Sequence, residues 1–320
     1  MTAVLDASGA WLPAQLGSVE RLLQERSGAH GPRLAADSTA TLSAGGKRLR
    51  PLLVLLCAGR EGGERASRAA TAVELVHMAS LVHDDVLDHA PLRRGHPTVA
   101  AASGRGRATA TGDLLFSQAF ALLAGPGDRR AVELLSDASV GLALGELAQR
   151  RDAYDTAVSE QRYLDRCRLK TARLFECACL MGRAAADRGS ADGEEPLRSF
   201  GAEIGLAFQL LDDVLDVTGP PERTGKARGT DLLDGTVNLP LIVASARDAG
   251  LRGLDLQGLS PAAAEALCDR IAATGALEEV RARALEMVAA AKRRLRDPGF
   301  DREQRQLLGL VADGVVERYS

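Results

Sequence analysis

One five-residue sequence, Asp-Asp-Val-Leu-Asp, occurs twice in this chain, at residues 84–88 and again at residues 212–216. Each copy follows a strongly apolar stretch, Leu75–Val82 in the first case and Ile204–Leu211 in the second. Aspartate is a poor helix former, and like charges four residues apart destabilise a helix by about 0.2–0.5 kcal/mol. Two such clusters beside core-like sequence therefore indicate that each requires a positive counter-charge.

The spacing of the aspartates indicates what that counter-charge is. Residues four apart share one face of a helix, so Asp84 and Asp88 can bind a single cation. Asp212 and Asp216 have the same spacing. Oxygen ligands suit Mg²⁺, which usually combines one or two carboxylates with the phosphates of a substrate. The repeat therefore predicts two acidic helix faces that converge on one magnesium–diphosphate cluster.

Composition favours an all-α protein. Only 3% of the 320 residues are aromatic, alanine, leucine and arginine are abundant, and alternating β-branched residues are scarce. A length of about 150 residues per domain would allow two domains, but no Pro/Ser-rich linker divides the chain. A site shared by the two acidic motifs also argues against a boundary between them. We expect a single domain over residues 1–320, with residues 1–13 loosely ordered.

Charge and cysteine content narrow the location and the partners. The net charge of −3 provides no basic field for nucleic acid. The five cysteines are odd in number and lie mostly in apolar helical contexts, as expected of reduced thiols in the cytoplasm. Cys177 and Cys179 lack the second Cys/His pair of a zinc site. The sequence shows neither a signal peptide nor an apolar run of about 18 residues that could span a bilayer.

Apolar periodicity predicts a series of helices separated by glycine-rich, proline-rich and polar segments. To within about 2–4 residues, the expected helices cover 14–27, a segment beginning near Pro51, 66–88, 112–124, 129–149, 159–183, 197–216, 238–249, 261–274, 276–296 and 301–318. Irregular segments are expected at 28–40, 89–106, 187–195 and 217–229.

Basic motifs supply the positive charge that a diphosphate requires. In the run 45–51, Gly-Gly-Lys-Arg-Leu-Arg-Pro, paired glycines let the backbone approach an anion closely. Lys47 and Arg50 can reach that anion from a loop that leads into a helix N-terminus. Arg93 and Arg94, just after the first acidic motif, repel each other unless an anion or an acid lies between them. For each motif, a solvated surface loop is the alternative interpretation.

Weaker candidates accompany both acidic motifs. Lys170-Thr171 lies inside a predicted helix, and Gln209 precedes the second acidic motif on the same helical face. Lys226 lies in the glycine-rich segment that follows that motif. His77 lies two helical turns before the first motif, where a core histidine is the alternative interpretation.

Taken in order over residues 40–245, these motifs resemble the trans-type isoprenyl (polyprenyl) diphosphate synthases. The matching set comprises the Gly-Gly-Lys-x-x-Arg-Pro signature, the run Asp84–Gly95, Gly112-Asp113, Lys170-Thr171 and Phe208-Gln209 before the second acidic motif. The resemblance implies an all-α, isoprenoid-synthase-like helical bundle around a deep central cavity, normally assembled as a homodimer. It also implies a prenyltransferase whose membrane contact, if any, is transient and serves product release.

The resemblance implies a role for each matching residue. Isopentenyl diphosphate is assigned to Lys47, Arg50, His77 and Arg94. The allylic diphosphate is assigned to Arg93, Lys170-Thr171, Gln209 and Lys226. Three Mg²⁺ ions are expected with substrate bound, and their protein ligands are Asp84, Asp88 and Asp212. The remaining acids of the motifs, Asp85, Asp213 and Asp216, are expected mainly to hold waters, lysines and orientation.

The implied chemistry needs no protein nucleophile and no general-base histidine. Mg²⁺ and cations draw charge onto the leaving diphosphate, and the C–O bond ionises to an allylic cation, which the isopentenyl double bond attacks. The groups expected to act in ionisation are Asp84, Asp88, Asp212, Arg93, Lys170 and Lys226. Thr236 departs from the family pattern, because a lysine that helps to hold the allylic diphosphate usually stands there.

Three other functions fit less well. A terpene cyclase binds no isopentenyl diphosphate, which would leave the two basic motifs of the first half without a purpose. A non-catalytic partner subunit of a heteromeric synthase should have eroded acidic motifs, and both are intact. A calcium-binding module should have the acid spacing and central glycine of an EF-hand loop.

A few residues before the first acidic motif bear on the length of the product. In the family, residues just before the first acidic motif lie under the growing tail. Here they are Ala79 and Ser80, with Val76 a turn deeper. Because small residues leave depth where an aromatic side chain would clash, we expect a product of roughly C30–C50 rather than farnesyl or geranylgeranyl diphosphate.

Overall fold

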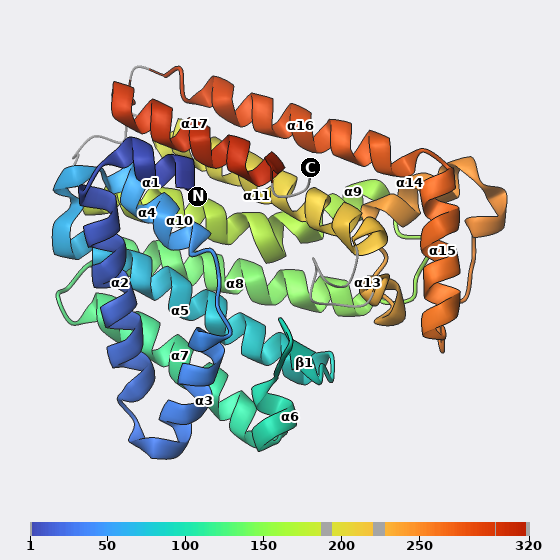
Figure 1. Ribbon diagram of the computed structural model, residues 1–320, viewed down its shortest axis with the longest axis horizontal. Coiled ribbons are helices and arrows are strands. Elements are labelled where there is room, and N and C mark those ends of the chain that lie inside the picture. Colours follow the sequence, from blue (N-terminus) through green and yellow to red (C-terminus); the bar gives the residue numbers. More distant parts are fainter. Residues whose placement is uncertain (1, 187–193, 220–227, 298, 318–320) are drawn as a thin grey trace. The chain divides into compact units, whose positions relative to one another are not determined.

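The computed structural model describes residues 2–186, 194–219, 228–297 and 299–317. Helices dominate these residues, and the β structure among them is one short antiparallel hairpin (Figure 1). The hairpin consists of β1 (Leu92–Arg93) and β2 (His96–Pro97). The all-α class expected from composition is therefore confirmed.

The α-helices along the chain are α1 (Thr2–Ser8), α2 (Trp11–Gly28), α3 (Gly31–Ser43), α4 (Leu49–Ala58), α5 (Gly63–Leu87), α6 (Val99–Ser103), α7 (Arg105–Ala124), α8 (Arg129–Arg151), α9 (Glu160–Cys167), α10 (Arg173–Ala185), α11 (Glu194–Thr218), α13 (Thr230–Leu233), α14 (Leu239–Arg247), α15 (Pro261–Ala273), α16 (Ala276–Arg294) and α17 (Arg302–Glu317). A π-helical turn, η2 (Arg168–Ala172), joins α9 to α10. Short 3₁₀ turns are η1 (Arg60–Gly62) and η3 (Ala249–Leu251).

Contacts divide the chain into two compact units. Unit 1 comprises residues 1–139, 174–199 and 295–311, and unit 2 comprises residues 140–173, 200–294 and 312–320. The divisions fall within helices such as α8 and α11 rather than in linkers. The first acidic motif belongs to unit 1 and the second to unit 2, and each unit is described by itself. The single-domain organisation expected from the sequence stays a prediction.

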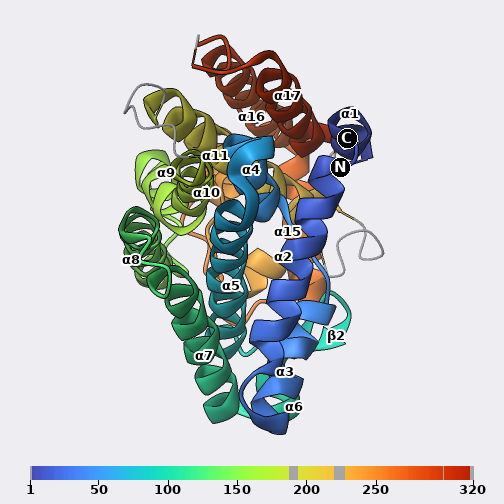
Figure 2. The same ribbon diagram turned by 90° about the vertical axis from the view of Figure 1, so that its left-hand side faces the viewer.

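In unit 1, α5 is the central helix. It packs against α7, α4 and α2, and Figure 2 shows it between α7 and α2. Small side chains such as Ala69, Ala70 and Ala72 are buried along it, which allows neighbouring helices to approach closely. This packing fixes the C-terminal end of α5, where the first acidic motif lies.

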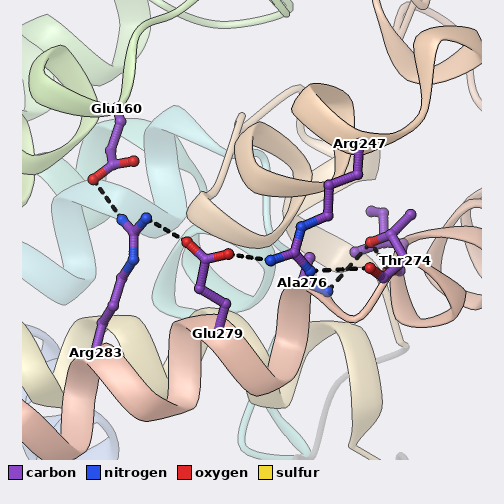
Figure 3. A network of polar contacts seen from close by, with 7 residues as sticks. Glu160, Arg247, Thr274, Ala276, Glu279 and Arg283 are labelled. Carbon is purple, nitrogen blue, oxygen red and sulfur yellow. Dashed lines mark hydrogen bonds and ion pairs between the residues drawn. The ribbon is translucent and has the colours of Figure 1, made fainter.

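In unit 2, polar contacts connect α9, α14 and α16. Arg283 of α16 donates to Glu160 of α9 at 2.5 Å and also pairs with Glu279 (Figure 3). Arg247 of α14 pairs with Glu279 and donates to the carbonyl oxygen of Thr274 at 3.0 Å. Because Glu279 lies between two arginines, the three helices are held by one network.

Two expectations about the first 43 residues were wrong. Residues 28–40, expected to be irregular, mostly form α3, which buries Asp37 and Leu42. The carboxylate of Asp37 accepts hydrogen bonds from Ser103 at 2.8 Å and from Arg107, partners that local sequence does not reveal. The first 13 residues, expected to be loosely ordered, are helical from residue 2 onward apart from a turn, with Val4 and Leu12 buried. Tertiary burial supplies the order in both segments.

The membrane expectation concerns helix length and polarity. Among the described residues, none of the helices combines the length and the apolar character that crossing a bilayer requires.

Candidate functional site

The first acidic motif lies where α5 ends. The helix stops at Leu87, and the N–H of Asp88 donates to the carbonyl oxygen of Asp84 at 2.8 Å. Asp84 and Asp88 are partly exposed one turn apart, whereas Asp85 is only 5% exposed. Asp85 accepts from Arg93, at 2.9 Å from Nε and 2.8 Å from Nη2. The outer aspartates thus form the accessible pair, and the middle one holds an arginine.

The segment after the motif is a hairpin rather than an irregular loop. Arg94 and Gly95 form its turn, with φ of 53° and 79°. Positive φ at both central residues matches the twist of a tight hairpin, and it is unfavourable for arginine. Thr98 closes the segment, because its N–H donates to Pro91 at 3.1 Å and its hydroxyl donates to Ala90 at 2.7 Å. The hairpin therefore presents two adjacent arginines from a fixed backbone.

The glycine pair before α4 approaches two of the arginines. A Cβ atom added to Gly46 would lie 3.0 Å from Nη1 of Arg48 and 3.3 Å from Nη1 of Arg94. A side chain at this position would press on the ends of both arginines, and glycine leaves room for them. Lys47 is exposed in the same loop.

Arg50 lies in the first turn of α4. Its guanidinium stacks on the ring of Phe175, 4.6 Å from the ring centroid. Burial lowers the pKa of Arg50 to about 10, although the negative charge of Glu74 acts in the opposite direction. Its Nε is buried, and within the described parts of the chain no hydrogen-bond acceptor contacts it. A desolvated cation with a donor to spare is suited to an anion.

His77 lies among positive charges. Burial lowers its pKa well below the ordinary value, and four nearby arginines lower it further, namely Arg50, Arg94, Arg93 and Arg48. The imidazole is therefore neutral, so it can donate a hydrogen bond without adding charge. The converging arginines favour the functional interpretation of His77 over that of a core histidine.

The second acidic motif lies inside a continuing helix. α11 extends past Asp216 to Thr218, so this copy does not end its helix. Asp213 is only 2% exposed and accepts from Tyr163 Oη at 2.5 Å, Gln209 Nε2 at 2.8 Å and the N–H of Leu239 at 3.3 Å. Burial, followed by the charge of Asp231, raises its pKa to about 7. The middle aspartate here is held by neutral donors.

Two further contacts orient this motif. The hydroxyl of Thr171 donates to Oε1 of Gln209 at 2.8 Å, which points the amide nitrogen of Gln209 at the motif. The carboxylate of Asp216 accepts from the N–H of Asp231 at 3.3 Å. Asp212 is partly exposed. The orienting role expected for Asp216 agrees with this contact.

Lys170 lies in the π-helical turn η2 and forms an ion pair with Glu146 of α8. Burial alone would raise the pKa of Glu146, but the charge of Lys170 holds that pKa below its usual value. A Cβ atom on Gly145 would lie 2.4 Å from the backbone nitrogen of Lys170, so α8 can approach the turn only with glycine there. π-helical turns are frequent at functional sites. Sequence reasoning missed Glu146, because an isolated glutamate in an amphipathic helix carries no signal.

Thr236, which stands where the family pattern has a lysine, lies in a segment whose backbone is held by hydrogen bonds. Its N–H donates to the carbonyl oxygen of Asp231 at 2.7 Å, and the N–H of Tyr154 donates to Gly235 at 2.8 Å. Gly235 has φ of 73°, and a Cβ atom there would lie 2.4 Å from the Tyr154 ring. Whether Thr236 alters substrate binding stays a prediction. Lys226 lies outside the described residues.

The acidic pairs have the donors for a divalent metal. Among the residues that the structure describes, no three His, Cys, Asp or Glu side chains gather into a cluster that could hold an ion. Asp84 with Asp88, and Asp212 with Asp216, each offer two carboxylates one helical turn apart. Such pairs suit a metal that completes its coordination with phosphate oxygens and water.

The residues expected to set product length lie on α5. Val76 and Ala79 are fully buried, and Ser80 is 6% exposed with its hydroxyl donating to the carbonyl oxygen of His77 at 2.7 Å. Helical spacing places Ser80 on the face of Asp84 and Ala79 to one side of it. Their role in product length stays a prediction.

Known proteins resemble this chain over most of its length. A family model described as polyprenyl synthetase matches residues 32–256. Heptaprenyl diphosphate synthase component 2 of Geobacillus stearothermophilus is 41% identical over 247 residues, 75% of each chain. Geranylfarnesyl diphosphate synthase of Aeropyrum pernix is 37% identical over 306 residues, 89% of this chain and 94% of that one.

A solved structure adds the comparison of fold. The polyprenyl synthase of Caulobacter crescentus, complexed with calcium and isoprenyl diphosphate, matches with a TM-score of 0.90 and 34% identity. The match covers 98% of this chain and 99% of that one.

Proposed function

Because the chain belongs to the polyprenyl synthetase family, we propose that it condenses isopentenyl diphosphate with an allylic diphosphate, head to tail (1′-4), into a trans-polyprenyl diphosphate. The observation that carries the proposal is the convergence of arginines on a neutral His77 beside a carboxylate pair. A diphosphate with its metal complements both features. A terpene cyclase binds no isopentenyl diphosphate, so the anion site that these arginines form would have no ligand.

We assign the two diphosphates as the family pattern suggests. Isopentenyl diphosphate is bound by Lys47, Arg50, His77 and Arg94. The allylic diphosphate is bound by Arg93, Lys170-Thr171, Gln209 and Lys226. The desolvated guanidinium of Arg50 and its unpaired Nε support the first assignment. The chain of hydrogen bonds from Thr171 through Gln209 supports the second.

Members of this family use a divalent metal, and we propose Mg²⁺, three ions with substrate bound, held by Asp84, Asp88 and Asp212. When bound, the metal supplies positive charge that favours departure of the diphosphate. Arg93, fixed by Asp85, keeps a guanidinium beside the acidic pair and neutralises further charge on the leaving group. Attack by the isopentenyl double bond forms the new C–C bond and leaves a cation on the isopentenyl unit. The released diphosphate takes a proton from the carbon next to that cation, which forms the new C=C bond, so the neutral His77 need only orient its substrate.

A product of roughly C30–C50 is the preferred outcome, because Val76, Ala79 and Ser80 are small. A shorter product, farnesyl or geranylgeranyl diphosphate, is the alternative. The Aeropyrum relative is a geranylfarnesyl diphosphate synthase, whose five-isoprene product lies between the two ranges. Ala79→Phe should shorten the product, whereas Ala79→Ser, the matched control, should not. An unchanged length distribution in an active Ala79→Phe variant would place the limit on another helix.

A second candidate function is a two-component synthase. The Geobacillus relative is component 2 of its synthase, which favours a two-component enzyme for this chain as well. The non-catalytic form of that alternative conflicts with two intact acidic motifs. The purified chain should be incubated with farnesyl diphosphate, isopentenyl diphosphate and Mg²⁺, and its products analysed by mass spectrometry. Polyprenyl products from the chain alone support the first proposal, and their absence favours the two-component enzyme.

We also propose a homodimer in the cytoplasm. α8 exposes Val140, Leu144 and Leu147, which are 57%, 52% and 66% exposed and share one helical face. Such a face is suited to the same face of a second copy. All five cysteines are free and buried, as in a reducing compartment. Light scattering should give a dimer for the wild type and a monomer for Leu144→Glu.

A further inference from the structure

We propose that Arg48 and Glu74 are positioning residues, a buried ion pair that sets the isopentenyl diphosphate site by holding the Gly45–Lys47 loop and Arg50 in place. The inference rests on the proposed function and adds to it two residues to which no role has been given.

The backbone of Arg48 is held in an unfavourable conformation. Its φ of 48° and ψ of 37° are left-handed, a region that is unfavourable for a non-glycine residue. The described residues other than glycine that share a positive φ are Arg48, His89, Arg94 and Tyr154. Such conformations persist where surrounding contacts impose them, often at functional sites. The contacts of the Arg48 side chain impose this backbone conformation.

The guanidinium of Arg48 joins three helices to the start of α4. Nε donates to Glu20 of α2 at 2.6 Å, and Nη1 donates to Glu74 of α5 at 3.1 Å. Nη2 donates to the carbonyl oxygen of Leu42 in α3 at 3.4 Å. Each nitrogen thus has a protein acceptor. Although Arg48 belongs to the basic signature, it is committed to the scaffold rather than to the diphosphate.

Glu74 is the buried end of this ion pair. Its side chain is 4% exposed, against 40% for Glu20. Its charge also acts on Arg50, whose pKa it raises against the larger effect of burial. Oε2 of Glu74 is buried and accepts no hydrogen bond within the described residues. Glu74 therefore offsets the mutual repulsion of the arginines before an anion arrives.

The same ion pair controls the loop. Gly46 lies so close to Arg48 and Arg94 that a Cβ atom would be 3.0 and 3.3 Å from their Nη1 atoms. A displacement of the Arg48 head therefore changes the space available to the Gly46 backbone and to Arg94. Arg93 has its own anchor in Asp85, at 2.9 Å. Loss of the Arg48–Glu74 pair should thus affect the isopentenyl diphosphate site and leave Arg93 in place.

The test compares variants of Arg48 and of its two glutamate partners, Glu74 and Glu20. Glu74→Gln and Arg48→Met should raise the KM for isopentenyl diphosphate by about tenfold, with kcat and the KM for the allylic diphosphate within about twofold of wild type. Arg48→Gly keeps the left-handed backbone without strain and should behave like Arg48→Met, because it lacks the side chain. Glu20→Gln is the matched control and should change either KM by less than about twofold.

Thermal unfolding and calorimetry separate positioning from mere stability. A purely structural role would lower the melting temperature and reduce kcat through the folded fraction, with both KM values unchanged, and that result would overturn the inference. If Glu74→Gln does not fold, Arg48→Lys should still weaken binding, because an ammonium lacks the planar head that contacts Glu74 and lies beside Gly46. Wild-type affinity for isopentenyl diphosphate in Arg48→Lys would equally overturn it.

Failure of the proposed function can be distinguished from failure of the Arg48–Glu74 inference. A wild type that yields no polyprenyl product by itself refutes the proposal that this chain alone is the synthase. Calorimetric titration of that protein and of Glu74→Gln with inorganic diphosphate still tests the ion pair, which predicts about tenfold weaker binding for the variant. Equal binding would refute the ion pair alone.

Discussion

The two copies of Asp-Asp-Val-Leu-Asp have the same sequence and different surroundings. In the first copy the helix ends at Leu87, and the middle Asp85 forms an ion pair with Arg93. In the second copy the helix continues to Thr218, and the middle Asp213 accepts hydrogen bonds from neutral groups. Both copies keep their outer aspartates partly exposed. The motif thus specifies which carboxylates are presented, and the surroundings specify how the motif is held.

The difference has electrostatic consequences. Asp85 has a cation beside it, and the same contact fixes the guanidinium of Arg93. Among the described residues, the donors to Asp213 are the neutral groups of Tyr163, Gln209 and Leu239, and burial raises its pKa to about 7. The first copy therefore couples the acid to Arg93, which we propose binds the allylic diphosphate. The second couples it to the scaffold, through Tyr163 and Leu239.

The largest expected effect tests whether both copies are needed. Asp84→Ala and Asp212→Ala should each lower kcat by about 100-fold or more, because each removes a carboxylate from the metal cluster. EDTA should abolish turnover and Mg²⁺ should restore it. Circular dichroism spectra should match the wild type as a control. Full turnover in EDTA, or a large loss from only one of the two variants, would contradict a shared role.

The next effect separates the cations that we assign to isopentenyl diphosphate from those that we assign to the allylic diphosphate. Lys47→Ala and Arg50→Ala should raise mainly the KM for isopentenyl diphosphate, since each loses a charge-assisted contact of about 1.5–3 kcal/mol. Arg93→Ala and Lys170→Ala should act mainly on the allylic substrate and on kcat. Steady-state kinetics with each substrate varied in turn measures the division. Equal effects of the four variants on both KM values would show that the two diphosphate sites are not separate.

A smaller effect compares the middle aspartates in stability. Asp85→Asn leaves Arg93 without its ionic partner and should lower the free energy of unfolding by about 1–3 kcal/mol. Asp213→Asn should cost less, because burial already disfavours the charge and the Gln209 amide can turn, with the Thr171 hydroxyl accepting in place of donating. Denaturant unfolding of both variants measures the order. A greater loss for Asp213→Asn would reverse our account of the two sites.

The smallest effect concerns the pH dependence of stability that His77, beside the first copy, contributes. Burial and the arginines hold the pKa of His77 well below its ordinary value, so the unfolded chain takes up a proton near pH 6.5 that the folded chain refuses. Stability should therefore fall as pH falls below 6.5. Between pH 7.5 and 5.5, wild type should lose about 1 kcal/mol more than His77→Gln. Parallel stability curves for the two proteins would show that His77 titrates normally.

Local patterns in the sequence determined the class of fold and singled out the candidate residues of the site. Helical periodicity depends on neighbours within a few residues, and so it located most of the helices within the limits stated for it. The spacing of four between Asp84 and Asp88, and the glycine pair before Lys47, act over one helical turn or one loop. The ordered set of such motifs was sufficient to indicate the family that the comparisons then showed.

Tertiary structure alone decided how these residues are held. Two identical pentapeptides cannot reveal that one middle aspartate faces Arg93 and the other Tyr163, because those partners come from different parts of the chain. Glu74 and Glu146 looked like ordinary helix residues until packing buried them against Arg48 and Lys170. Burial and long-range pairing depend on residues distant in the sequence, and the pattern around any one residue does not contain them.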